Sequence, residues 1–151
     1  MIWIGTNIGA ALGWSLGEPY GVAVDSSGNL YIADPYNNVV EEVSPGGTLS
    51  IVAGDGIYGA ATAGPATESD LSQPTGVAVD SNGNLYIADN FGQYVEEVTP
   101  DGQLSILAGT GAAGTPKPGP ATSSPLDFPN GVATDNSGDV FVADSGNFVV
   151  E

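Results

Sequence analysis

Carboxylates are the residues of this sequence that could do chemistry, and they recur at one fixed spacing. Aspartates occupy two positions in each of three copies that lie 55 residues apart: Asp25, Asp80 and Asp135, then Asp34, Asp89 and Asp144. Such groups could bind a metal ion or transfer a proton. A catalytic site needs one asymmetric set of residues, however, whereas a fold needs the same turn in every copy. Because Asp side chains readily accept hydrogen bonds from backbone N–H groups in turns, the repetition indicates a structural role.

The other residues that could take part in a reaction are equally unpromising for catalysis. Glu41-Glu42 and Glu96-Glu97 alternate faces on an extended strand, so neither pair can act as a close acid–base dyad. The sequence has no His and no Cys, and it contains neither a Gly-x-Ser-x-Gly motif nor a phosphate-binding glycine loop. We therefore expect no catalytic residue, no metal site, no cofactor and no enzymatic activity.

An internal repeat must position these residues. The segment Gly21 to Asp25 returns as Gly76 to Asp80 and as Gly131 to Asp135, with one substitution in the third copy. Residues 21–54 and 76–109 share 24 of 34 positions, and residues 131–151 share 9 of 21 with residues 76–96. A period of this length indicates a solenoid, a propeller or an array of repeats.

Each copy contains four short apolar runs separated by turn residues. In the first copy the runs are 21–24, 30–33, 39–43 and 49–53, and the segments between them are rich in Asp, Asn, Gly and Pro. This pattern predicts four consecutive antiparallel strands. Helical structure is expected only as one short turn at 65–71 and another at 120–126. Four-stranded units with long connections predict an all-β fold, a β-propeller with three blades at 21–54, 76–109 and 131–151.

The repeated segments resemble a known family. Pro74 to Asp80, followed by Gly83 to Asp89, is similar to the NHL repeat, as are Pro19 to Asp34 and, more loosely, Pro129 to Asp144. The linker motif Gly64-Pro65-Ala66-Thr67 and its copy at 119–122 resemble those of bacterial extracytoplasmic NHL proteins. The resemblance implies six blades in a complete ring and an extracytoplasmic or secreted parent protein.

One departure from the family pattern affects function. NHL repeats commonly carry a basic residue early in the third strand, where this sequence has Val39, Tyr94 and Val149. The basic surface by which some members of the family bind RNA therefore has no counterpart here. Other relatives are lyases or hydrolases that use metal ions or histidines, which makes a metal-assisted enzyme with its site at the channel mouth the alternative hypothesis.

The strand inventory suggests self-association. Residues 2–5 match 51–54 and 106–109, so residues 1–5 read as an unpaired fourth strand, whereas residues 148–151 read as a third strand. We expect a homodimer with a six-bladed ring, in which residues 1–5 of each chain complete the last blade, 131–151, of the other. The candidate interface residues are Ile2, Trp3, Ile4, Phe148, Val149 and Val150. A fragment of a longer gene, an engineered piece or a ring with another number of copies would also fit.

The net charge of −17, with Lys117 as the only basic residue, argues against nucleic acid or an anionic membrane as a partner. An acidic surface that maintains solubility explains this charge, and attraction of a cationic ligand is the alternative. There is no apolar run long enough to span a membrane, and Met1 to Trp14 lacks the basic start of a signal peptide.

The candidate binding surface follows from strand direction. The turns between second and third strands and the long linkers, 54–74 and 109–129, should emerge on one face of the ring, and function commonly lies on such loops. We expect a ligand or a protein to bind there, on a non-enzymatic scaffold; coverage of blade edges is the alternative role for the aromatic residues. The residues Tyr20, Thr75 and Asn130 should surround the axis, and only Asn130 among them offers an oxygen suited to calcium. The other candidates are Tyr36, Asn38, Phe91, Gln93, Asn147, Tyr58 and Trp14.

Overall fold

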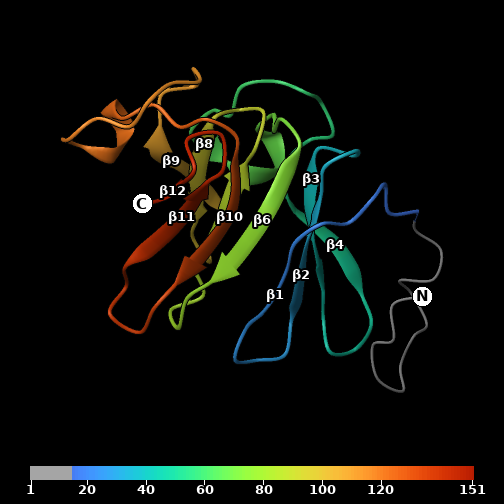
Figure 1. The fold of residues 1–151 in the computed structure, drawn as a ribbon. Helices are drawn as coiled ribbons and strands as arrows, with labels where there is room; N and C mark the ends of the chain where they lie inside the picture. Colours follow the sequence, from blue (N-terminus) through green and yellow to red (C-terminus); the bar gives the residue numbers. More distant parts are fainter. Residues whose placement is uncertain (1–14) are drawn as a thin grey trace.

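The fold is that of a computed structural model, which describes residues 15–151. The strand expected at 1–5, its interface residues Ile2, Trp3 and Ile4, and the loop candidate Trp14 lie outside the described residues. The described chain is all-β apart from two short 3-10 turns, and its strands form three antiparallel sheets (Figure 1).

Blade 1 is a four-stranded sheet in chain order. Its strands are β1 (Val22–Val24), β2 (Leu30–Asp34), β3 (Val39–Val43) and β4 (Leu49–Ala53). Consecutive antiparallel pairing arises because each strand is followed by a tight turn. In the first turn, Asp25 Oδ1 accepts hydrogen bonds from the backbone N–H groups of Ser27 and Asn29, each at 2.9 Å, while Gly28 adopts a φ of 86°. The same bonds recur at Asp80 and Asp135, so the predicted structural role of these aspartates is confirmed.

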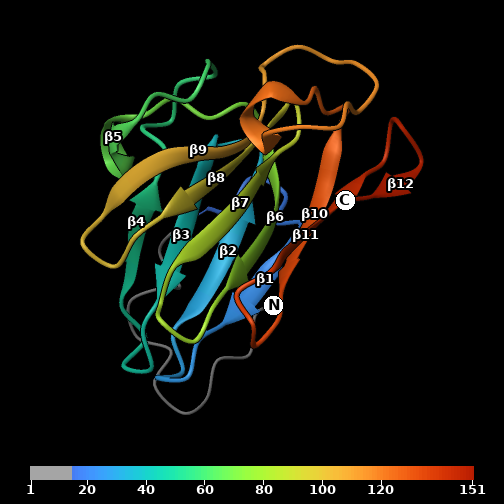
Figure 2. The ribbon, with the colours of Figure 1, turned by 90° about the vertical axis from the view of Figure 1, so that its left-hand side faces the viewer.

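Blade 2 has the same four strands and a short fifth. Strands β6 (Pro74–Val79), β7 (Leu85–Asp89), β8 (Tyr94–Val98) and β9 (Gln103–Gly109) follow chain order. Strand β5 (Gly64–Pro65) belongs to the linker from blade 1 and pairs with Gln103 and Leu104 of β9 (Figure 2). The linker therefore covers part of the outer edge of the blade that follows it, which the sequence pattern did not predict.

Blade 3 consists of three strands, β10 (Pro129–Thr134), β11 (Val140–Asp144) and β12 (Val149–Val150).

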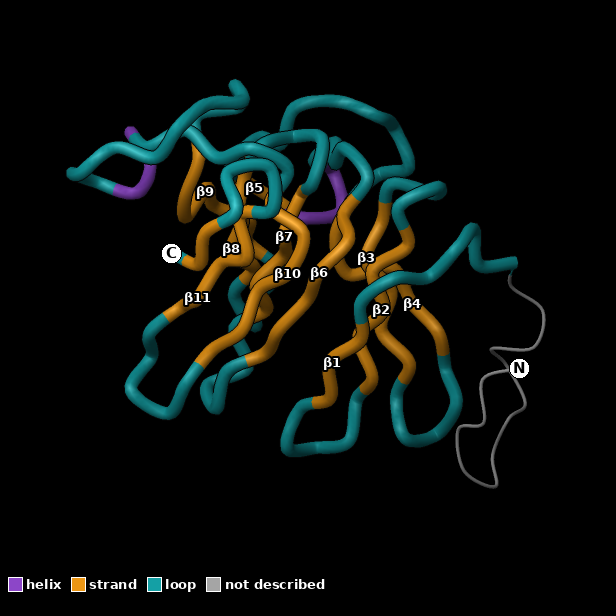
Figure 3. The backbone as a smooth tube through the Cα atoms, in the orientation of Figure 1, coloured by secondary structure: helices purple, strands orange, loops and turns teal. Residues whose placement is uncertain are grey.

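The predicted helical turns are shorter than expected: η2 spans Ala66–Glu68 and η3 spans Ala121–Ser123, both in the linkers (Figure 3). Conversely, β6 and β10 begin earlier than predicted, at their prolines, because a bulge after each proline allows the strand to continue. Within residues 15–151, no helix has the length and apolar character needed to cross a membrane.

The loops separate onto two faces as strand direction requires. In Figure 1 the linkers run along the top of the molecule, and the turns that follow β1, β3, β6 and β10 lie at the bottom. The turns between β2 and β3, between β7 and β8 and between β11 and β12 lie on the same side as the linkers. We call this side the loop face.

The apolar core lies between blades, as a repeat architecture requires. Between blades 1 and 2, Tyr31, Ala33 and Val40 pack with the cluster that contains Ile87 and Leu104. A smaller cluster joins blades 2 and 3 through Val95, Leu126 and Val142. Near the axis, adjacent first strands approach so closely that a Cβ added to Gly76 would lie 2.9 Å from the backbone oxygen of Asn130, so glycine is required there.

Both ends of the three-bladed arc present apolar side chains to solvent. On blade 1, Val22 is 63% exposed and Val24 and Ile51 are also exposed. On blade 3, Phe141, Val149 and Val150 are exposed, and Phe148 is 93% exposed. Phe141 and Val150 occupy the positions that Tyr31 and Val40 occupy in blade 1, where these residues are buried against blade 2. The end of blade 3 thus carries the side chains that form a blade junction elsewhere in the chain.

Candidate functional site

The loop face contains a pocket beside the propeller axis. It has a volume of about 190 Å³ and is lined by residues of all three blades. Five of the sequence-predicted binding residues come together in it: Tyr20, Tyr36, Thr75, Phe91 and Asn130. Three further residues, Pro35, Gln73 and Asn90, complete the lining and were not predicted. We call this cavity the axial pocket.

The aromatic side chains of the axial pocket are accessible, and one of them is held in place. Tyr20, Tyr36 and Phe91 are all exposed. The ring of Phe91 meets the ring of Phe128 edge to face, with centroids 5.4 Å apart and planes at 75°. The backbone N–H of Phe91 donates to Ser72 O at 3.0 Å, so both the ring and its backbone are fixed.

The polar groups of the axial pocket keep free hydrogen-bonding capacity. Thr75 Oγ1 donates to Asn130 O at 3.1 Å and so joins blades 2 and 3 near the axis. Asn90 is buried and donates through Nδ2 to Pro129 O at 3.1 Å, which leaves its carbonyl oxygen available as an acceptor. These bonds orient the side chains without consuming all their acceptors.

The predicted polar candidates Asn38 and Gln93 each accept a hydrogen bond from a linker. Asn38 Oδ1 accepts from the backbone N–H of Gln73 at 3.1 Å, and Gln93 Oε1 accepts from that of Phe128 at 2.7 Å. Gln73 and Phe128 occupy equivalent positions just before the first strands of blades 2 and 3, so each bond ties one blade to the next. In blade 3 the equivalent position is Phe148, whose side chain has no hydrogen-bond acceptor.

The remaining loop candidates lie outside the axial pocket. Asn147 donates from Nδ2 to Asp144 Oδ2 and to Gly114 O, each at 2.7 Å, which fixes the turn between β11 and β12 to its linker. Tyr58 lines a separate pocket of about 210 Å³ together with Tyr94 and Phe91, so Phe91 lines both pockets. Of the predicted set, therefore, Asn38, Gln93, Asn147 and Tyr58 do not line the axial pocket.

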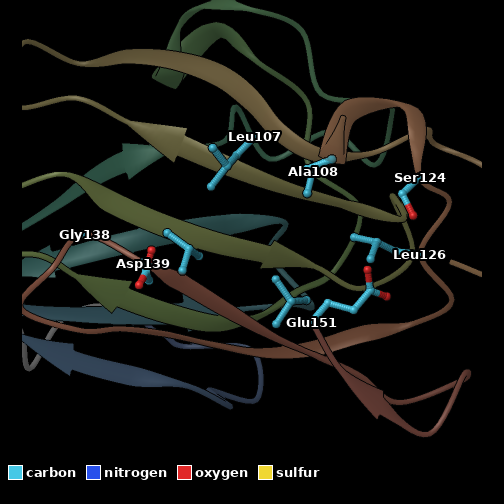
Figure 4. A pocket seen from close by; sticks show the side chains of 10 residues that line it. Leu107, Ala108, Ser124, Leu126, Gly138, Asp139 and Glu151 are labelled. Carbon is cyan, nitrogen blue, oxygen red and sulfur yellow. The ribbon is translucent and has the colours of Figure 1, made fainter. Parts of the chain in front are cut away.

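A third hollow, of about 320 Å³, lies at the outer part of blade 3 (Figure 4). We call it the blade 3 pocket, and its lining includes Leu107, Ala121, Leu126, Val142 and Glu151. One repeat earlier, the counterparts of Leu107, Ala121, Leu126 and Val142 belong to the same apolar cluster as Leu104 and Ile106 of β9. The pocket therefore lies where a fourth strand fills the junction between blades 1 and 2.

Carboxyl pairs recur in every blade, and in blades 1 and 2 both members of the pair are buried, whereas Glu151 of blade 3 is exposed. The aspartate that ends the second strand accepts a backbone N–H from the linker: Gly17 to Asp34, Ser72 to Asp89 and Asp127 to Asp144, each at 2.8 Å. A glutamate on the third strand lies on the same face of each sheet, namely Glu41, Glu96 or Glu151. Burial, reinforced by Asp34, raises the pKa of Glu41 to about 7, and burial with the charge of Asp89 raises that of Glu96. The sequence signal for these pairs was the constant spacing between this Asp and this Glu in each repeat. The Glu-Glu dipeptides are more conspicuous, and the sequence prediction considered only them.

Three similar sheets, each joined to the next through its first strand beside a common axis, define part of a β-propeller. The family model for the NHL repeat matches residues 71–92 and 126–150. The chain therefore carries NHL repeats at these residues, and together with the blade architecture this match supports an NHL-repeat β-propeller family.

Two relatives in sequence are much longer than this chain. Protein SUPPRESSOR OF QUENCHING 1 of Arabidopsis thaliana is 27% identical over 146 residues, which are 90% of this chain and 14% of that protein. Human NHL repeat-containing protein 2 is 36% identical over 84 residues, or 54% of this chain and 12% of that protein. The chain thus spans about an eighth of the length of these relatives.

Solved structures support the fold. A structural genomics protein of unknown function from Bacteroides thetaiotaomicron superposes with a TM-score of 0.78 at 25% identity, over 87% of this chain and 34% of the other. An auxiliary nutrient binding protein from the same organism gives 0.72 at 17%, over 85% and 35%. Virginiamycin B lyase from Staphylococcus aureus gives 0.55 at 15%, over 89% and 40%. Both binding proteins and enzymes thus share this blade arrangement.

Proposed function

We propose that this chain is a non-enzymatic, self-assembling NHL-type propeller scaffold, a half-propeller that binds a small ligand or a protein through its loop face. The observation that carries the proposal is the axial pocket, because residues far apart in sequence, from Tyr20 to Asn130, line one cavity there. Concave sites with aromatic walls and a few oriented polar groups are the usual form of small-molecule sites.

The assembly half of the proposal rests on the blade 3 pocket and the exposed ends of the arc. Leu107, Leu126 and Val142 line an apolar hollow of the kind that a β-strand fills in the preceding junction. Residues 2–5 have the sequence character of the ends of β4 and β9. In the proposed homodimer, these residues of the partner occupy the blade 3 pocket, and six blades close the ring.

Light scattering coupled to size exclusion tests the assembly. A constant mass of twice 15.1 kDa over a range of concentrations is the expected result. Deletion of Met1 to Gly5 should then leave monomers or aggregates, because the blade 3 pocket would lose its occupant. A monomeric parent chain, or a deletion variant with the parent's mass, would contradict strand exchange.

Chemical-shift mapping tests the binding face. The 15N-labelled chain is titrated with a mixture of small neutral, cationic and anionic metabolites, and shift changes are expected at Tyr36, Phe91 and Asn130. Changes confined to the opposite turns, around Gly28, Gly83 and Gly138, would contradict binding at the loop face. Both faces are read in the same spectrum, so each serves as the control for the other.

The alternative function is that of a metal-assisted lyase or hydrolase at the channel mouth. Similar solved propellers include lyases, but at 15% identity the likeness concerns the fold alone. Turnover of lactone or ester substrates that requires calcium and stops in chelator would favour the enzyme over the scaffold. The scaffold proposal expects no turnover and an unchanged fold in chelator.

A further inference from the structure

We propose that the axial pocket binds one neutral pyranose sugar unit, either free or at the end of an oligosaccharide. The inference rests on the proposed loop-face binding and gives that site a ligand class. Its basis is the combination of accessible aromatic rings with uncharged hydrogen-bonding groups in a cavity of limited size.

The aromatic side chains supply surfaces for stacking. Tyr36 and Phe91 come from equivalent turns of blades 1 and 2, and both line the pocket with exposed rings. The edge contact with Phe128 holds the ring of Phe91 before any ligand arrives, which reduces the conformational cost of binding. The apolar C–H faces of a pyranose carry partial positive charge and can pack on the electron-rich face of such a ring.

The polar lining suits hydroxyl groups. Gln73 and Asn130 carry side-chain amides, which both donate and accept, and Asn90 keeps a free carbonyl oxygen after donating to Pro129. A sugar hydroxyl also donates and accepts, so each can pair with an amide and with the hydroxyl oxygen of Thr75. A ligand without hydroxyl groups would leave these groups unpaired on binding.

The charge of the pocket and of the whole chain further restricts the class of ligand. None of the eight residues that line the pocket is an acid or a base of the Asp, Glu, Lys or Arg type. The chain as a whole carries a net charge of −17, so an anionic ligand would be repelled. A cationic ligand would find no carboxylate among the lining residues to pair with.

The volume limits the ligand to one ring. Pockets that enclose drug-sized ligands have volumes of roughly 300–1,000 Å³, whereas the axial pocket has about 190 Å³. A single hexose unit is small enough to enter, and further sugar units would extend over the loop face beside Tyr20.

Saturation-transfer NMR and calorimetry test the inference with four probes: D-glucose, adenosine, choline and glucose 6-phosphate. We expect D-glucose alone to bind, with Kd in the millimolar range, and the Phe91→Ala variant to bind it about tenfold more weakly. Tyr36→Ala should act in the same direction. The matched control is Tyr58→Ala, which removes a loop-face aromatic that lies outside the axial pocket.

The outcomes separate this inference from the proposed function. Adenosine or choline that binds in place of glucose, and loses affinity in Phe91→Ala, would overturn the sugar assignment while loop-face binding stands. Glucose binding that is equally weakened in Tyr58→Ala and Phe91→Ala would overturn the axial pocket as its site. If no probe binds while the metabolite mixture shifts signals at Phe91, only the sugar assignment fails. If the mixture also leaves the loop face unchanged, both fail. Circular dichroism of each variant confirms that it is folded.

Discussion

Glu96 of β8 lies on the same face of blade 2 as Asp89 of β7, and both side chains are 0% exposed. Glu96 pairs in register with Ile87, two residues before Asp89, so the two carboxyl groups are diagonal neighbours. Asp89 accepts the backbone N–H of Ser72, whereas neither carboxyl oxygen of Glu96 has a hydrogen-bond partner among the described residues. Two such carboxyls cannot both be ionised at low cost, and burial raises the pKa of Asp89 to about 7 and that of Glu96 well above its ordinary value. Glu96, whose oxygens lack hydrogen-bond donors among the described residues, is the member of the pair that keeps a proton more readily.

This pair makes stability fall as the pH rises. Burial and then the charge of Asp89 raise the pKa of Glu96 well above its ordinary value of 4.5 in the folded chain. The folded chain therefore binds more protons than the unfolded chain above that value, and stability is lost as the pH rises toward the raised pKa. Glu41 acts in the same direction between 4.5 and about 7.

The urea midpoint of the chain is accordingly expected to decrease from pH 5 to pH 8. Glu96→Gln should make this decrease smaller, because an amide cannot ionise, and Glu41 should account for part of what remains. Glu97→Gln is the matched control, since the neighbouring side chain points to the other face of the strand. An equal pH dependence in the parent chain and in Glu96→Gln would contradict the assignment of the proton.

Gly76 and Gly131 are expected to respond differently to the same substitution. In Gly76→Ala the new Cβ would lie 2.9 Å from the backbone of Asn130 and Gly131, which should cost about 1–3 kcal/mol of stability. In Gly131→Ala the nearest atom is Ala143 Cβ at 3.8 Å, so the three-bladed arc should tolerate it. Thermal unfolding of both variants measures the difference.

Gly131→Ala also tests the ring. In the proposed ring, blade 1 of a second chain lies beside blade 3 in the same way that blade 3 lies beside blade 2. The methyl group added at Gly131 should then weaken the dimer without unfolding the chain. Light scattering against concentration would then show dissociation at higher concentrations than for the parent. A dimer that persists unchanged would mean that Gly131 does not face a neighbouring blade.

The hydrogen bond from Phe128 to Gln93 is expected to contribute to the junction between blades 2 and 3. Gln93→Met keeps the length of the side chain and removes the acceptor, which leaves the backbone N–H of Phe128 unpaired, at a cost of about 1 kcal/mol. The free energy of unfolding in urea measures it. Gln103→Met, at an exposed position, provides the control, and equal stabilities of the two variants would show that the bond contributes nothing.

Asp80 should stabilise its turn by roughly 1–2 kcal/mol, because its carboxylate accepts the backbone N–H groups of Asn82 and Asn84. Asp80→Ala removes these two bonds together with those from the Asn84 amide and the Tyr86 hydroxyl, and the melting temperature measures the loss. Asp101→Ala serves as the comparison, since Asp101 is exposed and, among residues 15–151, accepts only from the hydroxyl of Thr99. A smaller loss for Asp80→Ala than for Asp101→Ala would contradict the structural role.

The sequence was sufficient to predict the consecutive strands of each blade and the loop face, because both follow from local signals. Turn residues such as Asp25 and Gly28 act within a few positions, and strand direction then assigns each loop to a face. The axial residues Tyr20, Thr75 and Asn130 were accessible to the same reasoning, since equal positions in each repeat must lie at equal distances from the axis.

Contacts between strands and linkers were harder to predict. Strand β5 pairs with a strand almost forty residues further on, and the partnership of Asp89 with Glu96 depends on register across two strands. Asn38 and Gln93 were predicted as ligand contacts because they occupy exposed turns, yet their oxygens accept linker N–H groups that only the packed blades bring near. Each of these features depends on long-range packing that no local pattern records.

In the proposed dimer, Phe148 would give the junction at the end of blade 3 a temperature response of its own. The junctions between the described blades each have a side-chain acceptor, Asn38 or Gln93, in the position that Phe148 occupies in blade 3. A joint formed at Phe148 must rely on apolar burial at this point, and apolar stabilisation weakens on cooling. Subunits joined there would separate in the cold while the blades within each chain stay together.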